Sequence, residues 1–181
     1  MSEFLIDKDW TLFLDRDGVI NHEVHLGYVN NWEEFKFYEG AKEAFKIFAA
    51  NFKYICLVTN QRGIGRGITK IENLHITHQN MTAQIVEDGG RIDGIYFCPD
   101  LALDSPGRKP NTGMAFQAKT DFPDIEFTKS IMVGNNLSDM GFGRNIGAKT
   151  VFLSTTLPET DPAIECIDAM YPTLYQFALS L

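Results

Sequence analysis

The chain has 181 residues, of which 44% are hydrophobic, enough to bury one core, so we expect a single domain over residues 1–181. Its formal net charge of -8 argues against non-specific binding to nucleic acid, which needs a basic surface, although a locally basic pocket can still hold a small anion. We find no signal peptide, no apolar run that would span a membrane and no cysteine spacing typical of disulfides, and we expect a cytoplasmic monomer with free thiols.

The first predicted strand ends in a pair of carboxylates. The apolar run over 12–14 is followed by Asp15 and Asp17, and Gly18 then permits a tight turn. Carboxylates at close range repel each other unless a cation lies between them, and Mg²⁺ prefers oxygen ligands of this kind. A solvated Asp-Arg-Asp turn is the alternative that this motif alone leaves open.

Helices and strands alternate along the rest of the chain after an aromatic-rich loop over 22–39. Apolar periodicity predicts helices over 40–50, 69–88, 113–120 and 139–146, strands over 54–58, 93–98, 130–133 and 150–153, and helical tail segments over 161–170 and 173–181. A capping box is expected at Thr69 and an N-cap at Thr112. His75 and His78 are expected on a solvated helix face.

The strand over 54–58 opens into residues that suit a phosphate group. The Thr59 hydroxyl and backbone N–H groups can donate hydrogen bonds to phosphate oxygens, glycines allow a close approach, and Arg62 or Arg66 adds positive charge. Later in the chain, Arg108 and Lys109 precede a predicted helix, where an ammonium would neutralise a phosphate or an attacking aspartate. The alternative for the first of these segments is an ordinary Gly-rich connection, and the alternative for the second is a solvated basic turn.

These polar groups should meet at one edge of a sheet. Strands that alternate with helices predict a mostly parallel, Rossmann-like α/β sheet flanked by helices, and such sheets bind ligands at the carboxyl ends of their strands. Asn135 and Asp139 follow the strand over 130–133, as Asp15 and Thr59 follow earlier strands. Convergence of these groups predicts an active site that no single motif establishes.

As an ordered set, these motifs resemble those of the haloacid dehalogenase (HAD) superfamily of phosphatases. The motifs are Asp15-Arg-Asp17-Gly, Thr59-Asn60-Gln61, Lys109, and Gly134-Asn135 to Asp139. More narrowly, Asp-Arg-Asp-Gly-Val-Ile-Asn, Val-Thr-Asn-Gln-Arg-Gly-Ile and Arg-Lys-Pro resemble the family of D-glycero-D-manno-heptose bisphosphate phosphatases and histidinol-phosphate phosphatases. The resemblance covers about residues 11–153 and implies a HAD-type hydrolase domain with a minimal cap.

The resemblance also implies residue roles for a Mg²⁺-dependent phosphomonoesterase that acts on a small sugar phosphate. Asp15 would attack phosphorus to form an aspartyl phosphate, and Asp17 would protonate the leaving oxygen and then deprotonate water. The residues expected to hold Mg²⁺ are Asp15, Asp17, Asn135 and Asp139. The residues expected to bind the substrate and its phosphate are Arg16, Thr59, Asn60, Gln61, Arg62, Arg108 and Lys109.

Two departures from the family pattern bear on this expectation. Where the family usually has an aspartate after the glycine of its fourth motif, this chain has Asn135, so we expect weaker Mg²⁺ affinity with activity retained. Relatives often carry a zinc site before the Arg-Lys-Pro motif, but the loop over 99–107 has no Cys or His, so we expect no zinc.

Three other functions stay open on the sequence alone. Histidinol phosphate is the nearest rival substrate, and a nucleic-acid 3′-phosphatase is a more distant possibility that the acidic net charge disfavours. A protein silenced by Asn135 could instead bind a phosphorylated ligand without turning it over. The intact Asp15, Asp17 and Lys109 argue against that last alternative.

Overall fold

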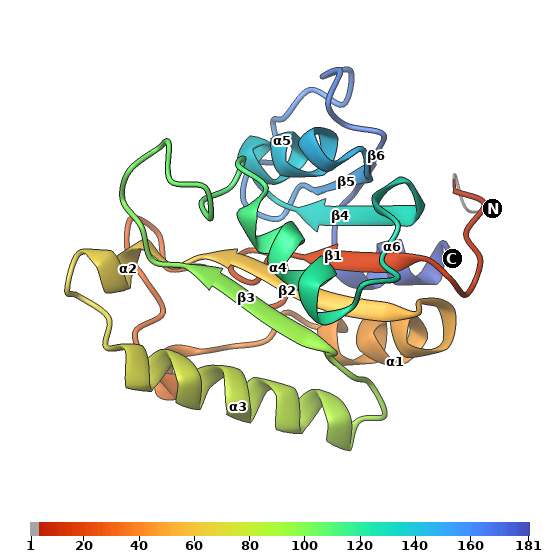
Figure 1. Cartoon of the computed structure of the whole chain (residues 1–181). Coiled ribbons are helices and arrows are strands. Elements are labelled where there is room, and N and C mark those ends of the chain that lie inside the picture. Colours follow the sequence, from red (N-terminus) through yellow and green to blue (C-terminus); the bar gives the residue numbers. More distant parts are fainter. Residues whose placement is uncertain (1–3) are drawn as a thin grey trace.

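The computed structural model describes residues 4–181, and a sheet of six strands runs through the middle of it (Figure 1). All neighbouring strands are parallel, in the order β3-β2-β1-β4-β5-β6. The strands are β1 (Thr11–Leu14), β2 (Tyr54–Asn60), β3 (Gly94–Cys98), β4 (Ser130–Gly134), β5 (Lys149–Leu153) and β6 (Ala169–Tyr171). The predicted Rossmann-like α/β sheet is therefore confirmed.

Helices cover both faces of this sheet. They are α1 (Ala41–Asn51), α2 (Arg62–Gly65), α3 (Ile71–Glu87), α4 (Gly113–Asp121), α5 (Leu137–Ile146) and α6 (Leu174–Leu179), with short 3-10 turns η1 (Trp32–Glu34) and η2 (Phe127–Lys129). Side chains of α1, α3 and α6 share one buried cluster with Leu12 and Leu14, whereas those of α4 and α5 share another with Phe13. Successive β1 residues thus point to opposite faces, as a strand requires.

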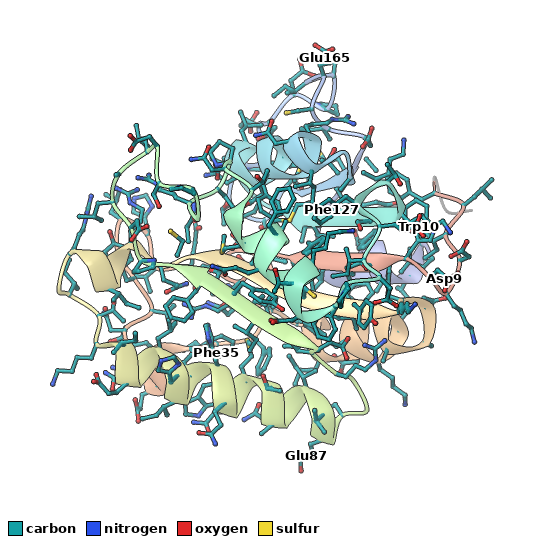
Figure 2. The ribbon with its side chains drawn as sticks, viewed as in Figure 1. Asp9, Trp10, Phe35, Glu87, Phe127 and Glu165 are labelled. Atoms are coloured by element: carbon teal, nitrogen blue, oxygen red, sulfur yellow. The ribbon has the colours of Figure 1, made fainter. Side chains whose placement is uncertain are left out.

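The buried side chains fill the space between the sheet and its helices. Figure 2 shows Phe35 between α3 and the sheet. On the opposite face of the sheet, the Phe127 and Phe13 rings pack together with their centroids 6.4 Å apart. β1 has no exposed residue and pairs with β2 on one side and β4 on the other. The carboxyl ends of β1, β2 and β4 are consequently neighbours at one edge of the sheet.

Two local predictions were wrong, and a third was correct only in part. No side-chain cap is present at the start of α3, because the Thr69 hydroxyl instead donates to Asn30 Oδ1 at 2.8 Å. Thr112 does occupy the N-cap position of α4, but the expected side-chain hydrogen bond is absent. The segment over 161–170 forms turns and then enters β6, because Asp168 is held by the backbone N–H of Thr150 at 2.8 Å and leads the chain into pairing with β5.

Cys56 and Cys98 are buried, Cys166 is partly buried, and all three are free thiols. Over residues 4–181, every helix is too short or too polar to cross a membrane.

Candidate active site

A cavity of about 440 Å³ opens at the carboxyl ends of β1, β2 and β4. Of the site residues predicted from the sequence, those that line it are Asp15, Asp17, Thr59, Asn60, Gln61, Arg62, Arg108, Lys109, Asn135 and Asp139. The structure therefore brings together groups from four separate segments of the chain. Arg16 is the exception, since it does not line this cavity.

The Lys109 ammonium lies between two carboxylates at the floor of the cavity. Its Nζ atom is 2.9 Å from Asp15 Oδ1 and 2.7 Å from Asp139 Oδ1, and the Lys109 and Asp139 side chains are each only 1% exposed. Burial opposes the charge on Lys109, but Asp139 and Asp15 outweigh it and raise the Lys109 pKa. Lys109 is therefore a permanently charged partner for the expected nucleophile.

The surroundings of Asp15 disfavour its charged form, chiefly because the side chain is buried. Burial raises its pKa to about 6, the Lys109 charge acts against this rise, and the neighbouring Asp139 and Asp17 carboxylates add to it. Its side chain is 14% exposed and faces the cavity. A cation bound beside Asp15 would relieve this repulsion.

Asp17 is held by hydrogen bonds from three side chains. Arg16 Nη2 donates to both of its carboxylate oxygens at 2.9 Å, Asn21 Nδ2 donates at 2.9 Å, and Gln61 Nε2 donates at 3.0 Å. Burial raises the pKa of Asp17, but the Arg16 charge and these hydrogen bonds outweigh burial and hold the pKa below its ordinary value. Arg16 thus acts on Asp17 and does not face the substrate cavity.

His78 contacts the end of the Arg16 guanidinium that does not bind Asp17, and the prediction for this residue was wrong. It is 5% exposed, where a solvated helix face was expected, and its Nε2 atom lies 3.2 Å from Arg16 Nη1. The helical spacing of His75 and His78 gave no sign of this contact, because Arg16 lies 62 positions away in the chain.

Gln61 and Asn60, at the carboxyl end of β2, contact different parts of the site. Gln61 Nε2 also donates to Thr59 Oγ1 at 2.9 Å, so the Thr59 hydroxyl keeps its own proton for another acceptor. Asn60 uses both ends of its amide on Lys109: its Oδ1 accepts from the Lys109 backbone N–H at 3.0 Å, and its Nδ2 donates to the Lys109 carbonyl at 3.3 Å. The Asn60 side chain therefore fixes the Lys109 backbone, and Asn60 also lines the cavity, so its expected phosphate contact stays a prediction.

Asn135 and Asp139 complete the floor of the cavity. Asn135 is 4% exposed, and its Nδ2 donates to Thr156 Oγ1 at 2.8 Å, a partner that the sequence did not indicate. Gly18, at φ +80°, allows this packing, because a Cβ atom there would lie 2.0 Å from Asn135 Nδ2. Asp139 Oδ2 accepts from the backbone N–H of Asn136 at 3.1 Å and caps α5.

The oxygen donors at this floor suit Mg²⁺. Within residues 4–181, no group of three or more His, Cys, Asp or Glu side chains is arranged to hold a metal ion, so amide or backbone oxygens would have to contribute. Both Asp139 oxygens already have partners, Lys109 and Asn136, whereas Asn135 Oδ1 accepts no hydrogen bond that the described residues donate. Asp15, the Asp17 carbonyl and Asn135 are hard oxygen donors of the kind that Mg²⁺ takes.

The outer wall of the cavity comes from loops. Asn111 Nδ2 donates to the carbonyls of Leu103 at 3.1 Å and Ser105 at 2.8 Å, and Arg108 Nη1 donates to the carbonyl of Leu101. These bonds hold the loop over 99–107, which places Leu103 in the wall.

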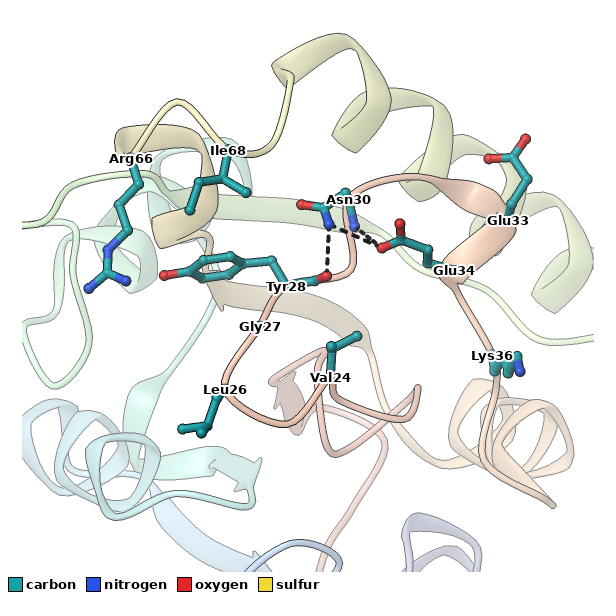
Figure 3. A pocket seen from close by; sticks show the side chains of 10 residues that line it. All are labelled: Val24, Leu26, Gly27, Tyr28, Asn30, Glu33, Glu34, Lys36, Arg66 and Ile68. Atoms are coloured by element: carbon teal, nitrogen blue, oxygen red, sulfur yellow. Dashed lines mark hydrogen bonds between the residues drawn. The ribbon is translucent and has the colours of Figure 1, made fainter.

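A second, open cavity of about 670 Å³ is lined in part by the segment around Tyr28 (Figure 3). Val24, Gly27 and Tyr28 line both cavities. Figure 3 shows Arg66 beside the Tyr28 ring, whose centre is 6.0 Å from the guanidinium, and Asn30 bonded to Glu34 and to the Tyr28 carbonyl. These contacts hold the segment around Tyr28, which lines both cavities.

Comparison with known proteins gives one consistent answer. The family model described as HAD-hydrolase-like matches residues 107–166. The D-glycero-alpha-D-manno-heptose-1,7-bisphosphate 7-phosphatase of Mycobacterium tuberculosis is 36% identical over 173 residues, which cover 95% of this chain and 91% of that protein. The enzyme of the same name from Campylobacter jejuni is 39% identical over 146 residues, 81% of this chain and 83% of that protein.

Solved structures agree with these relatives. The D,D-heptose 1,7-bisphosphate phosphatase from B. bronchiseptica, a complex with magnesium and phosphate, superposes with a TM-score of 0.83 at 25% identity and covers 94% of this chain and 96% of its own. The corresponding protein from Burkholderia thailandensis gives 0.69 at 26% identity, covering 94% and 97%. The chain therefore belongs to the HAD family of phosphatases that includes the heptose bisphosphate phosphatases.

Proposed function

We propose that this protein is a Mg²⁺-dependent phosphomonoesterase that removes phosphate from a small sugar phosphate, D-glycero-D-manno-heptose 1,7-bisphosphate. The observation that carries the proposal is the pairing of Asp15 with the buried Lys109 at the floor of a cavity that also contains Asp17 and Thr59. The substrate is taken from the names of relatives that match this chain along most of its length. A cytoplasmic location and a monomeric state stay predictions from the sequence.

The chain's own residues account for two chemical steps. Asp15 attacks phosphorus, the bond to the sugar oxygen breaks, and Asp17 gives a proton to that oxygen. Because Arg16 and the other donors lower the Asp17 pKa in the free protein, this step requires Asp17 to take up its proton when the anionic substrate binds beside it. Asp17 then takes a proton from water as the water oxygen attacks the phosphorus of the aspartyl phosphate, which releases phosphate and regenerates Asp15. Lys109 and the Thr59 hydroxyl, which line the cavity, would bind the phosphoryl oxygens. Mg²⁺, when held by Asp15, the Asp17 carbonyl and Asn135, offsets negative charge on these oxygens.

The proposal includes no zinc. The loop over 99–107 offers neither Cys nor His, and zinc is held by about four nitrogen, sulfur or carboxylate ligands. Hydrogen bonds from Asn111 and Arg108 to its carbonyl oxygens hold this loop.

A phosphate-release assay tests the proposed function. We expect turnover of heptose 1,7-bisphosphate in the presence of Mg²⁺, and slower or no turnover of histidinol phosphate and other sugar phosphates. Asn135 supports a second candidate, a silenced protein that binds a phosphorylated ligand. That candidate replaces the first if no compound is hydrolysed at high Mg²⁺ while one of them still raises the melting temperature.

Asn135→Asp should tighten Mg²⁺ binding. The added carboxylate restores a negative charge beside Asp15 in a site where ligand charge sets metal affinity, so we expect the Kd to fall about tenfold. Isothermal titration calorimetry with MgCl₂ and no substrate measures it directly. Asn136→Asp is the matched control, because it adds the same charge one residue away and Asp is a good N-cap for α5. Equal Mg²⁺ affinity in the two variants would contradict the assignment of Asn135.

A further inference from the structure

Arg16 links the interior of the protein to the expected acid and base Asp17. Its side chain is 1% exposed, and its Nη2 atom donates to both Asp17 oxygens at 2.9 Å while Nε donates to Oδ1 at 3.3 Å. The remaining nitrogen, Nη1, lies 3.2 Å from His78 Nε2 on α3. The guanidinium thus lies between a carboxylate at the cavity and an imidazole behind it.

The direction of the hydrogen bond from Arg16 to His78 follows from the chemistry of the two groups. A guanidinium has only donors, so His78 Nε2 has to be the acceptor and the imidazole proton has to be on Nδ1. Burial and the adjacent Arg16 charge lower the pKa of His78 to about 3, so the ring is neutral. The Phe97 ring of β3 packs edge-on against it, with centroids 6.3 Å apart.

We propose that His78 is a positioning residue for Asp17: its Nε2 atom accepts from Arg16 Nη1 and so fixes the guanidinium in the orientation that holds both Asp17 oxygens. The effect on catalysis rests on the proposed phosphatase function, whereas the hydrogen bond and the tautomer do not. A side chain that only fills space next to Phe97 would not need an acceptor atom. The presence or absence of that atom therefore distinguishes positioning from packing.

Paired substitutions separate the two roles. His78→Leu keeps a similar apolar volume without an acceptor, and His78→Gln offers an amide oxygen to Arg16. A loosened catalytic group costs roughly ten- to a hundredfold in rate, so we expect His78→Leu to lower kcat by that factor with KM nearly unchanged, and His78→Gln to recover most of it. Equal kcat values for the two variants, or a loss carried by KM alone, would overturn the proposal.

A spectroscopic measurement tests the hydrogen bond without any turnover. In the ¹⁵N-labelled wild-type protein at pH 7, long-range ¹H–¹⁵N correlation should show His78 as the neutral tautomer with its proton on Nδ1. A proton on Nε2 would overturn the proposal, even if both variants failed to fold. If the tautomer is as expected but the wild type hydrolyses none of the sugar phosphates, the hydrogen bond stands and the proposed function fails.

Discussion

Asp15→Asn should abolish phosphate release, with kcat lowered by about a thousandfold or more, because an amide cannot replace the carboxylate that attacks phosphorus. The fold should survive this change. The substitution removes a buried carboxylate whose pKa is already raised to about 6, and Lys109 keeps Asp139 at 2.7 Å. We expect the free energy of unfolding to change by about 1 kcal/mol only.

Phosphate release and thermal unfolding, measured on the same preparation, check this expectation. Asp88→Asn is the matched control, since it removes one carboxylate from a surface pair with Lys42 and should leave kcat unchanged. A residual rate within tenfold of the wild type would mean that water attacks the substrate directly. Asp15 would then not be the nucleophile.

The convergence of the site could be predicted from the sequence because it follows from the sheet. Apolar runs that end in Asp15, Thr59 and Asn135 are buried strands, and parallel strands place their carboxyl ends at one edge. Lys109 required an additional argument, since it follows a loop and not a strand. The motif order supplied it, and the distances to Asp15 and Asp139 agree with the expected role.

The partners of individual side chains could not be predicted, because they lie far apart in the chain. Asn60 bonds to Lys109 across 49 positions, and Arg16 reaches His78 across 62. Local pattern favoured a solvated face for His78, which is wrong, and neither local pattern nor the motif match indicated that the Asn60 side chain bonds to Lys109. The segment over 161–170 shows the same limit, since a helix expected from local pattern gave way to pairing between β6 and β5.

The balance of charge at the site explains why Lys109 should matter for both stability and catalysis. The buried Arg16 guanidinium, whose side chain is 1% exposed, is paired with Asp17. Among residues 4–181, Lys109 is the one cation paired with the other two carboxylates, Asp15 and Asp139. Removing one partner of a buried ion pair leaves the other charges uncompensated, which is far more costly than losing a surface pair.

Lys109→Met should therefore destabilise the protein by about 3–5 kcal/mol at pH 8 in the absence of divalent metal, and should abolish turnover. The loss of stability should depend on pH. Asp15 titrates at about 6, above its ordinary 3.8, and Lys109 is the charge that lowers its pKa, so the substitution raises the pKa further. A carboxyl whose pKa is raised in the folded state loses stability as the pH rises through that pKa, so the variant should suffer most above pH 6.

Urea unfolding at pH 5 and pH 8 with a chelator present measures this difference. The gap between the wild type and Lys109→Met should be smaller at pH 5, where Asp15 in the variant is protonated and no longer repels Asp139. Lys42→Met is the control, because the Lys42 side chain is 33% exposed and its surface pair with Asp88 is screened by water, so its loss should matter far less at either pH. A gap that is equal at both pH values would show that Lys109 stabilises the fold by packing, and that its charge does not hold the two carboxylates together.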